Sequence, residues 1–394
     1  MSNYAAIQTY AFQSAASIIA GRHSITTLRD RLQMMGEIRS ALLVTGSAME
    51  SLGVVDELTL QLNSAGISLQ VLKGVVQEPT IGNIEQLFSS IAGEHFDALI
   101  GLGGGSILDA AKILSVMKTN EKPLREMLGT DLIPRRGVPL VLIPTTSGTG
   151  SEVTPNAIVT LPEEELKVGI ISRYLLPQLA ILDPMLTLQL PKQITAATGM
   201  DAFTHAFESF ISNKANPISD MFAMESIRRI SRSIVEAYQD GGSIEARENM
   251  LLGSMYGGMA LTGAGTAAVH ALAYPLGGKF HIPHGVANSM LLPHVTEFNL
   301  DAISNRLTNV AQAMGFRHDV SMTASQAADF VLTRISEWIK ELQIPQNLAE
   351  YGVTEADVEA LAQAASKVTR LLNNNPKAMS LDHIQDVYKK LLPK

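Results

Sequence analysis

Length, composition and charge limit what this chain can be. It has 394 residues, of which 46% are hydrophobic and 17% charged, a net charge of -8 and no cysteine. The length predicts two domains, and the acidic balance argues against a nucleic-acid or anionic-membrane partner. Without cysteine there is no disulfide, thiolate metal site or thiol nucleophile. There is no basic leader and no apolar run of about 18 residues, so we expect a cytoplasmic protein.

The first half of the chain alternates apolar runs with helical patterns. Strand-like runs occupy 14–20, 41–45, 68–72, 97–102, 138–143, 157–160, 168–171 and 179–182. Helical patterns occupy 26–35, 57–64, 81–92 and 107–117. Strands alternating with helices predict a parallel sheet with helices on both faces.

A glycine turn follows the strand at 97–102. Gly103-Gly104-Gly105-Ser106 leads into a helix, where backbone N–H groups bind phosphate and glycines allow its close approach. Asp109 would lie in the first turn of that helix, where a carboxylate suits the helix dipole. Leu108 stands where the last glycine of a GxGxxG motif would be, so a plain tight turn explains the run equally well.

A second loop, rich in hydroxyls, follows the strand at 138–143. It is the run Pro144-Thr145-Thr146-Ser147-Gly148-Thr149-Gly150-Ser151-Glu152. Hydroxyls and backbone amides together suit a polyol or phosphate ligand. A polar loop that ends in a helix cap is the alternative.

After Pro191 the pattern becomes helical. Helices are predicted at 192–212, with a possible break at Gly199, at 218–238 and 246–261, and again from 304 to the end. Asn347 and Thr354 are N-cap candidates. We see no strand there, so we expect an α/β dinucleotide-binding domain at 1–186 and an all-helical domain at 187–394.

The start of the helical half carries metal-type ligands. Asp201 and His205 are four residues apart and therefore share a helix face. His270 and His284 follow in a second, mostly apolar stretch, and the four side chains would suit one divalent metal. The alternative is that the histidines are ordinary core or surface residues and the Asp–His pair a simple helix contact.

Together, these motifs resemble those of the iron-dependent (group III) alcohol dehydrogenases. The likeness rests on Gly103-Gly104-Gly105-Ser106, the loop at 144–152, Gly199-Met200-Asp201-Ala202 and Pro283-His284-Gly285, which occur in the family's order over the whole chain. The resemblance implies a Rossmann-like parallel-sheet nucleotide domain and an all-α metal-binding domain, a dehydroquinate synthase-like fold. It implies a homodimer or higher homo-oligomer.

The resemblance also implies a reaction and its residues. Fe²⁺, Zn²⁺ or another divalent metal would be held by Asp201, His205, His270 and His284. NAD or NADP would contact Gly103 to Ser106, Asp109, Thr145, Thr146, Ser147, Thr149 and Lys167. The expected reaction is reversible hydride transfer between a small primary alcohol, diol or hydroxy acid and NAD(P), which gives the aldehyde or ketone. The metal would polarise the substrate oxygen.

Two positions depart from the family pattern. Tyr274 stands where many members have a second histidine; it either relays a proton or only shapes the pocket. Gly46 and Ser47 replace the usual Asp that bonds the ribose 2′-OH and repels a 2′-phosphate, so NADP is not excluded.

Two other functions fit parts of the pattern. One is a metal-dependent lyase-type cyclase on the related dehydroquinate synthase scaffold. The other is a nucleotide- or metal-binding module without catalysis. The Asp-x-x-x-His helix and the Pro-His-Gly motif favour the dehydrogenase.

Overall fold

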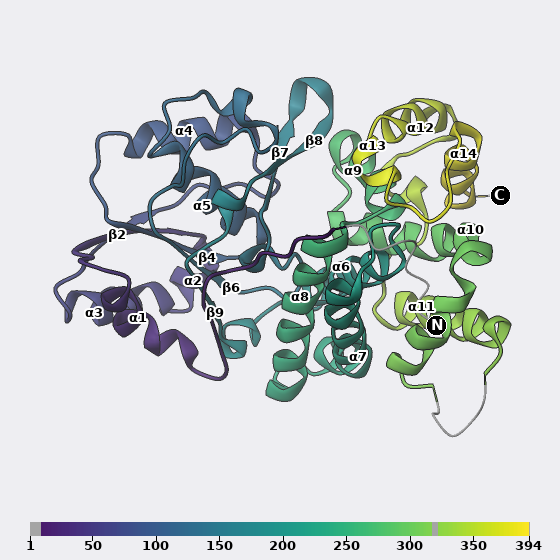
Figure 1. The fold of residues 1–394 in the computed structure, drawn as a ribbon, viewed down its shortest axis with the longest axis horizontal. Helices are drawn as coiled ribbons and strands as arrows, with labels where there is room; N and C mark the ends of the chain where they lie inside the picture. Colours follow the sequence, from purple (N-terminus) through teal and green to yellow (C-terminus); the bar gives the residue numbers. More distant parts are fainter. Residues whose placement is uncertain (1–8, 317–321, 394) are drawn as a thin grey trace. The chain divides into compact units, whose positions relative to one another are not determined.

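The computed structural model describes residues 9–316 and 322–393 (Figure 1), which fold into two compact units. The α/β unit comprises Gln13–Thr146 and Gly150–Thr187. The helical unit comprises the chain from Leu188 onward, the segment that ends at Phe12, and Ser147–Thr149. A domain boundary at residue 186 remains a proposal, because two short segments that precede it in the sequence belong to the helical unit.

The α/β unit is built on a six-stranded sheet in the order β1-β9-β6-β4-β2-β3. Every neighbouring pair is parallel, as the alternation of strands and helices predicted. Parallel neighbours need crossover connections, which the intervening helices supply. The strands are β1 (Ile18–Ala20), β2 (Ser40–Thr45), β3 (Ser68–Leu72), β4 (Ala98–Gly103), β6 (Leu140–Pro144) and β9 (Leu179–Leu182).

Helices cover both faces of this sheet (Figure 1). Successive strand residues point to opposite faces. Leu42 and Val44 of β2 therefore pack with α4 and α5, and Ala41 and Leu43 pack with α1 and α3. The helices of this unit are α1 (Leu28–Met34), α2 (Ser47–Ser51), α3 (Val54–Asn63), α4 (Ile81–Ile91) and α5 (Gly105–Met117).

A small second sheet has the order β5-β8-β7. It consists of β5 (Gly129–Thr130), β7 (Asn156–Leu161) and β8 (Leu166–Ile171), of which β7 and β8 form an antiparallel hairpin. The sequence analysis did not separate these runs from the strands of the main sheet. Period and composition identify a strand but not its partner.

The helical unit is organised around α6 (Lys192–Ile211), whose residues from Gly199 onward are all buried. No break occurs at Gly199, because its missing Cβ makes room for Met250 and Ile234 on neighbouring helices. The other helices are α7 (Pro217–Gln239), α8 (Ile244–Ala264), α9 (Ala268–Phe280), α10 (His284–Ala313), α11 (Ala324–Glu341), α12 (Val358–Ser366), α13 (Thr369–Leu372) and α14 (Leu381–Lys390).

The sequence pattern predicted no helix over residues 262–303, and this prediction was wrong. The structure has α9 and most of α10 there, with Pro275 and Pro293 inside them. Proline normally ends a helical pattern, but burial of both helices in the core of the helical unit outweighs the lost hydrogen bonds. The predicted caps Asn347 and Thr354 are confirmed, although each begins a 3-10 helix.

Within the described ranges, no helix combines the length and hydrophobicity that crossing a bilayer requires.

Candidate functional site

Helix α6 presents an acid and an imidazole on one face. The side chains of Asp201 and His205 are both buried, and the distance from Asp201 Oδ1 to His205 Nε2 is 3.9 Å. The i, i+4 spacing found in the sequence is sufficient to produce this arrangement.

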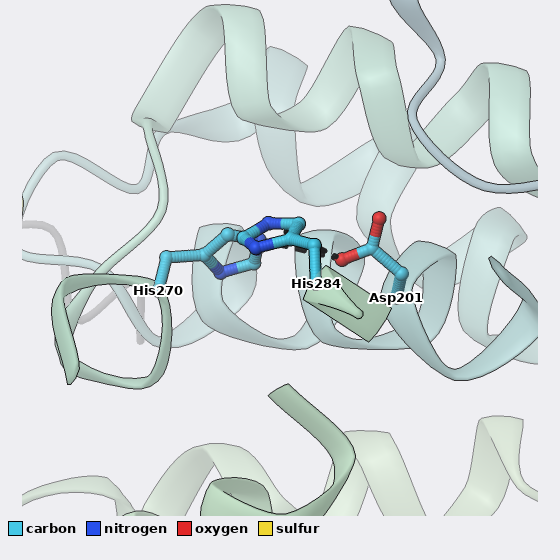
Figure 2. Close-up of side chains that lie close together, drawn as sticks. All are labelled: Asp201, His270 and His284. Carbon is cyan, nitrogen blue, oxygen red and sulfur yellow. Dashed lines mark ion pairs between the residues drawn. The ribbon is translucent and has the colours of Figure 1, made fainter. Parts of the chain in front are cut away.

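Helices α9 and α10 bring two further histidines to the same carboxylate oxygen. Asp201 Oδ1 lies 3.6 Å from His270 Nε2 and 3.8 Å from His284 Nε2. One ligand atom from each of these three residues lies within 4.8 Å of the others (Figure 2). Two ligand atoms of a tetrahedral zinc would be about 3.4 Å apart. The three side chains would therefore need to move only slightly closer together to bind a metal.

His205 lies beside this compact group of three. Its ring stacks on that of His270 with 4.6 Å between centroids. Its Nδ1 is 3.3 Å from the carbonyl oxygen of Gly148, which accepts a hydrogen bond when Nδ1 carries the proton. That tautomer leaves Nε2 free to bind a metal on the side of Asp201.

Asn288 of α10 marks the point where these acceptors converge. Its side-chain nitrogen donates to Asp201 Oδ1 at 2.7 Å and lies 3.2 Å from Nε2 of both His270 and His284. Its Oδ1 is buried and has no hydrogen-bond partner among residues 9–316 and 322–393. The Asn288 amide nitrogen therefore lies where three acceptor atoms converge, and a cation would suit the same surroundings.

The charges at this position also favour a cation. Burial opposes the ionisation of Asp201, but the neighbouring histidines outweigh it and hold its pKa below the ordinary value. Burial lowers the pKa of His205, which favours the neutral, metal-binding imidazole. Burial also lowers the pKa of His270, yet its hydrogen bonds to Asp201 and Glu208 outweigh burial and raise that pKa to about 9, so a metal would displace one proton from this imidazole when it binds.

These residues fit a resident divalent metal. Asp201 is a buried carboxylate faced by imidazoles, and a buried negative charge is stabilised by pairing or by metal coordination. Nitrogen and carboxylate oxygen donors without sulfur suit Zn or Fe(II).

Two nearby residues from the sequence analysis have different surroundings. Tyr274 is buried on α9, one turn after His270, and its ring centroid is 6.0 Å from that of His284. His281 is exposed in a left-handed conformation at the end of α9, outside the compact group.

The predicted phosphate turn lies at the carboxyl end of β4. Helix α5 begins at Gly105, two residues earlier than predicted, so Asp109 lies in its second turn rather than its first. A Cβ on Gly103 would lie 2.5 Å from the Ile107 side chain, and one on Gly104 would lie 3.3 Å from Thr146. The turn is therefore too tight for larger residues, and the first N–H groups of a helix, which lack carbonyl partners one turn earlier, suit a phosphate.

Other predicted nucleotide residues gather in the same unit. Gly46 is the N-cap of α2, and a Cβ there would contact the same Ile107 at 3.2 Å. Ser106 Oγ accepts from the N–H of Glu78, whose carboxylate pairs with buried Lys167 at 2.7 Å. The sequence analysis missed Glu78, which stands outside any recognised motif.

The hydroxyl loop divides between the two units. Thr145 is buried, and its N–H donates to the Gly103 carbonyl at 3.0 Å. Ser147 and Thr149 belong to the helical unit, as does Gly148.

Models of one protein family match almost the whole chain. The model for iron-containing alcohol dehydrogenase matches residues 15–184, and the model for the C-terminal part of the Fe-containing alcohol dehydrogenase family matches 195–392. The chain belongs to the iron-containing alcohol dehydrogenases. Such enzymes are oxidoreductases that interconvert alcohols and aldehydes, and the family implies a divalent metal and NAD(P).

Individual relatives agree with this assignment. The chain is 38% identical to long-chain-alcohol dehydrogenase 1 of Geobacillus thermodenitrificans over 350 residues, 88% of each chain. A crystal structure of 1,3-propanediol oxidoreductase matches with a TM-score of 0.93 at 34% identity, covering 98% of this chain and 100% of that one. Sulfoacetaldehyde reductase of Bifidobacterium kashiwanohense, solved with NAD+, matches with a TM-score of 0.88 at 27% identity, covering 98% and 99%.

In this iron-containing alcohol dehydrogenase, a buried cluster of charged side chains connects α5 to residues 151–158, at and after the end of the hydroxyl loop. Asp109 accepts hydrogen bonds from Ser151 Oγ at 2.5 Å and from the Ile158 N–H at 2.9 Å. Lys112 donates to the carbonyls of Thr154 and Asn156. Both oxygens of Asp109 therefore already accept from protein donors, and its predicted contact with a pyrophosphate remains a prediction.

Because of Glu152, which belongs to this cluster, we expect the stability of the folded protein to depend on pH. Its carboxyl group is buried, and burial raises its pKa from 4.5 to about 7. The folded state therefore binds more protons than the unfolded state between these values, and stability falls as pH rises through that window. We expect Glu152→Gln to remove this pH-dependent loss of unfolding free energy, which amounts to at most roughly 3 kcal/mol.

The measurement is the melting temperature of both proteins from about pH 5 to about pH 7.5, below the pKa of about 8 to which burial lowers Lys112. The advantage of Glu152→Gln over the parent should grow with pH. A constant difference would contradict the assigned pKa.

Proposed function

We propose that this chain catalyses reversible hydride transfer between a small primary alcohol, diol or hydroxy acid and NAD(P). The observation that carries the proposal is one buried carboxylate oxygen, Asp201 Oδ1, faced by the Nε2 atoms of His205, His270 and His284 at 3.6–3.9 Å. These four residues would hold Fe²⁺, Zn²⁺ or another divalent metal. When bound, the metal would polarise the substrate oxygen and the nicotinamide would exchange the hydride.

The chain's own residues would support this reaction by holding its parts. The turn at Gly103 to Ser106 would bind the pyrophosphate through backbone N–H groups at the start of α5. Thr145, Thr146, Ser147, Thr149 and Lys167 would contact the rest of the nucleotide. The Asn288 amide would keep Asp201 oriented through its 2.7 Å hydrogen bond.

Tyr274 would lie beside the substrate, because it follows His270 by one turn of α9 and its ring adjoins that of His284. Its hydroxyl would pass a proton or, alternatively, only shape the pocket wall. A homodimer or larger homo-oligomer completes the proposal on the family resemblance alone, and a cytoplasmic location stays a prediction from the sequence.

The test is metal analysis combined with turnover. Protein purified without chelator should hold about one equivalent of iron or zinc. It should form NADH or NADPH from members of a panel of small primary alcohols, diols such as 1,3-propanediol, and hydroxy acids. Chelation should abolish turnover and the metal should restore it. Chelator-insensitive turnover by metal-free protein would contradict the metal site, and strict rejection of NADP would contradict the interpretation of Gly46.

A further inference from the structure

Glu208 is a buried carboxylate on the metal-site helix that the sequence analysis did not select. It lies on α6 seven residues after Asp201, about two turns along the same face. Its side chain is 1% exposed. A carboxylate removed from water in this way must be satisfied by donors of the protein.

Glu208 first supplies the cap that α9 lacks. The N-cap residue Ala267 has no side-chain acceptor, so the first N–H groups of the helix need another partner. Glu208 accepts from the N–H of Ala267 at 3.0 Å and from that of Val269 at 2.6 Å. The start of α9 is therefore attached to α6.

Glu208 also contacts the ligand histidine itself. Its Oε2 lies 2.6 Å from Nδ1 of His270, and both rest within the core. A carboxylate that already accepts from two backbone donors has no proton to give, so Nδ1 must carry the proton of this hydrogen bond. The lone pair of the neutral imidazole then lies on Nε2, the atom 3.6 Å from Asp201 Oδ1.

We propose that Glu208 is a positioning residue that holds His270 in the tautomer and orientation required to bind the metal. The inference rests on the proposed function, since it takes His270 as a ligand. Partners of this kind typically change metal affinity by roughly 10–100-fold when replaced.

Glutamine at this position gives a sharp test because it cannot satisfy the same three donors. Its single amide oxygen can replace only one carboxylate oxygen. If the amide nitrogen faces His270, the imidazole must accept at Nδ1 and carry its proton on Nε2, the atom needed by the metal. If the amide nitrogen faces Val269 instead, two N–H donors, that of the glutamine amide and that of the Val269 backbone, face each other at the start of α9.

The experiment is a titration of metal-free protein with Zn²⁺ and with Fe²⁺, which yields a dissociation constant without any activity assay. We expect Glu208→Gln to weaken binding roughly 10–100-fold. Glu225→Gln is the matched control, because Glu225 lies on α7 of the same unit and pairs with Arg228 and Arg229 rather than with the site. The control should bind as tightly as the parent.

A second readout separates positioning from capping. If Glu208 only caps α9, the variant should lose melting temperature without metal but keep the parent's dissociation constant, and this result would overturn the proposal. If the parent itself binds no metal, both the proposed function and this inference fall. If the parent binds metal and Glu208→Gln binds it as tightly, the inference alone falls.

The parent protein offers a test that does not depend on a variant's folding. In the Zn²⁺-loaded parent labelled with ¹⁵N-histidine, NMR should show the proton of His270 on Nδ1 and the metal-bound nitrogen as Nε2. A His270 protonated on Nε2 would overturn the proposal.

Discussion

His270→Ala is expected to abolish metal retention and alcohol oxidation while nucleotide binding by the α/β unit persists. The variant removes one nitrogen from the group of Asp201, His270 and His284 and leaves Glu208 without its imidazole partner. The loss of metal affinity should exceed the roughly 10–100-fold loss seen when only a supporting partner of a ligand is replaced. Elemental analysis, turnover and NADH binding to the same preparation check the three parts of this expectation.

His281→Ala is the matched control, because His281 lies in the same stretch but is exposed at the end of α9. It should retain metal and activity. Full metal content in His270→Ala would remove His270 from the ligand set and make His281 the first replacement to examine. Loss of nucleotide binding together with the metal would instead indicate general unfolding.

Gly285→Ala is expected to destabilise the helical unit severely and to separate two ligand helices. A Cβ at Gly285 of α10 would lie 2.1 Å from the carbonyl oxygen of Ala197 on α6 and 2.6 Å from its carbonyl carbon. Both are backbone atoms, so the helices themselves must move apart. His284 adjoins this contact and Asp201 lies one turn beyond it, so the approach of these two residues depends on the glycine.

Gly285→Ala should lower the free energy of unfolding by more than the value of about 1–3 kcal/mol that is typical of an overpacked core, where side chains can move. Urea unfolding of the parent and the variant measures it, and the Zn²⁺ dissociation constant reports the damage to the site. Gly82→Ala is the control, since Gly82 lies exposed in α4 with space for a Cβ and should gain about 0.5–1 kcal/mol. An equal effect of both substitutions would contradict the role of close helix approach.

Local signals predicted much of this protein. Buried strands such as β2 and β4 are short apolar runs that end at glycine, and the alternation with helices implied a parallel sheet. The pair Asp201 and His205 followed from helix geometry alone, because residues four apart face the same way. The motif resemblance identified the family, which the family models confirm.

Other features required long-range packing. Proline at 275 and 293 obscured α9 and α10 in the sequence, and burial of both helices in the core of the helical unit explains their helical state. The hairpin β7–β8 pairs apart from the main sheet, and a strand's partner is not encoded in its own period. The order of strands in the main sheet likewise came from the structure.

The sequence by itself therefore determined the family and the combination of a parallel sheet with a helical part, and it predicted the residues that we propose bind metal. Only the tertiary structure decided which residues support them. Glu208 reaches His270 across 62 residues and Asn288 reaches Asp201 across 87. No local pattern specifies such pairs, because they depend on how closely two helices approach. For Asn288 and Asp201, the close approach of α10 to α6 is possible because Gly285 rests on the backbone of Ala197.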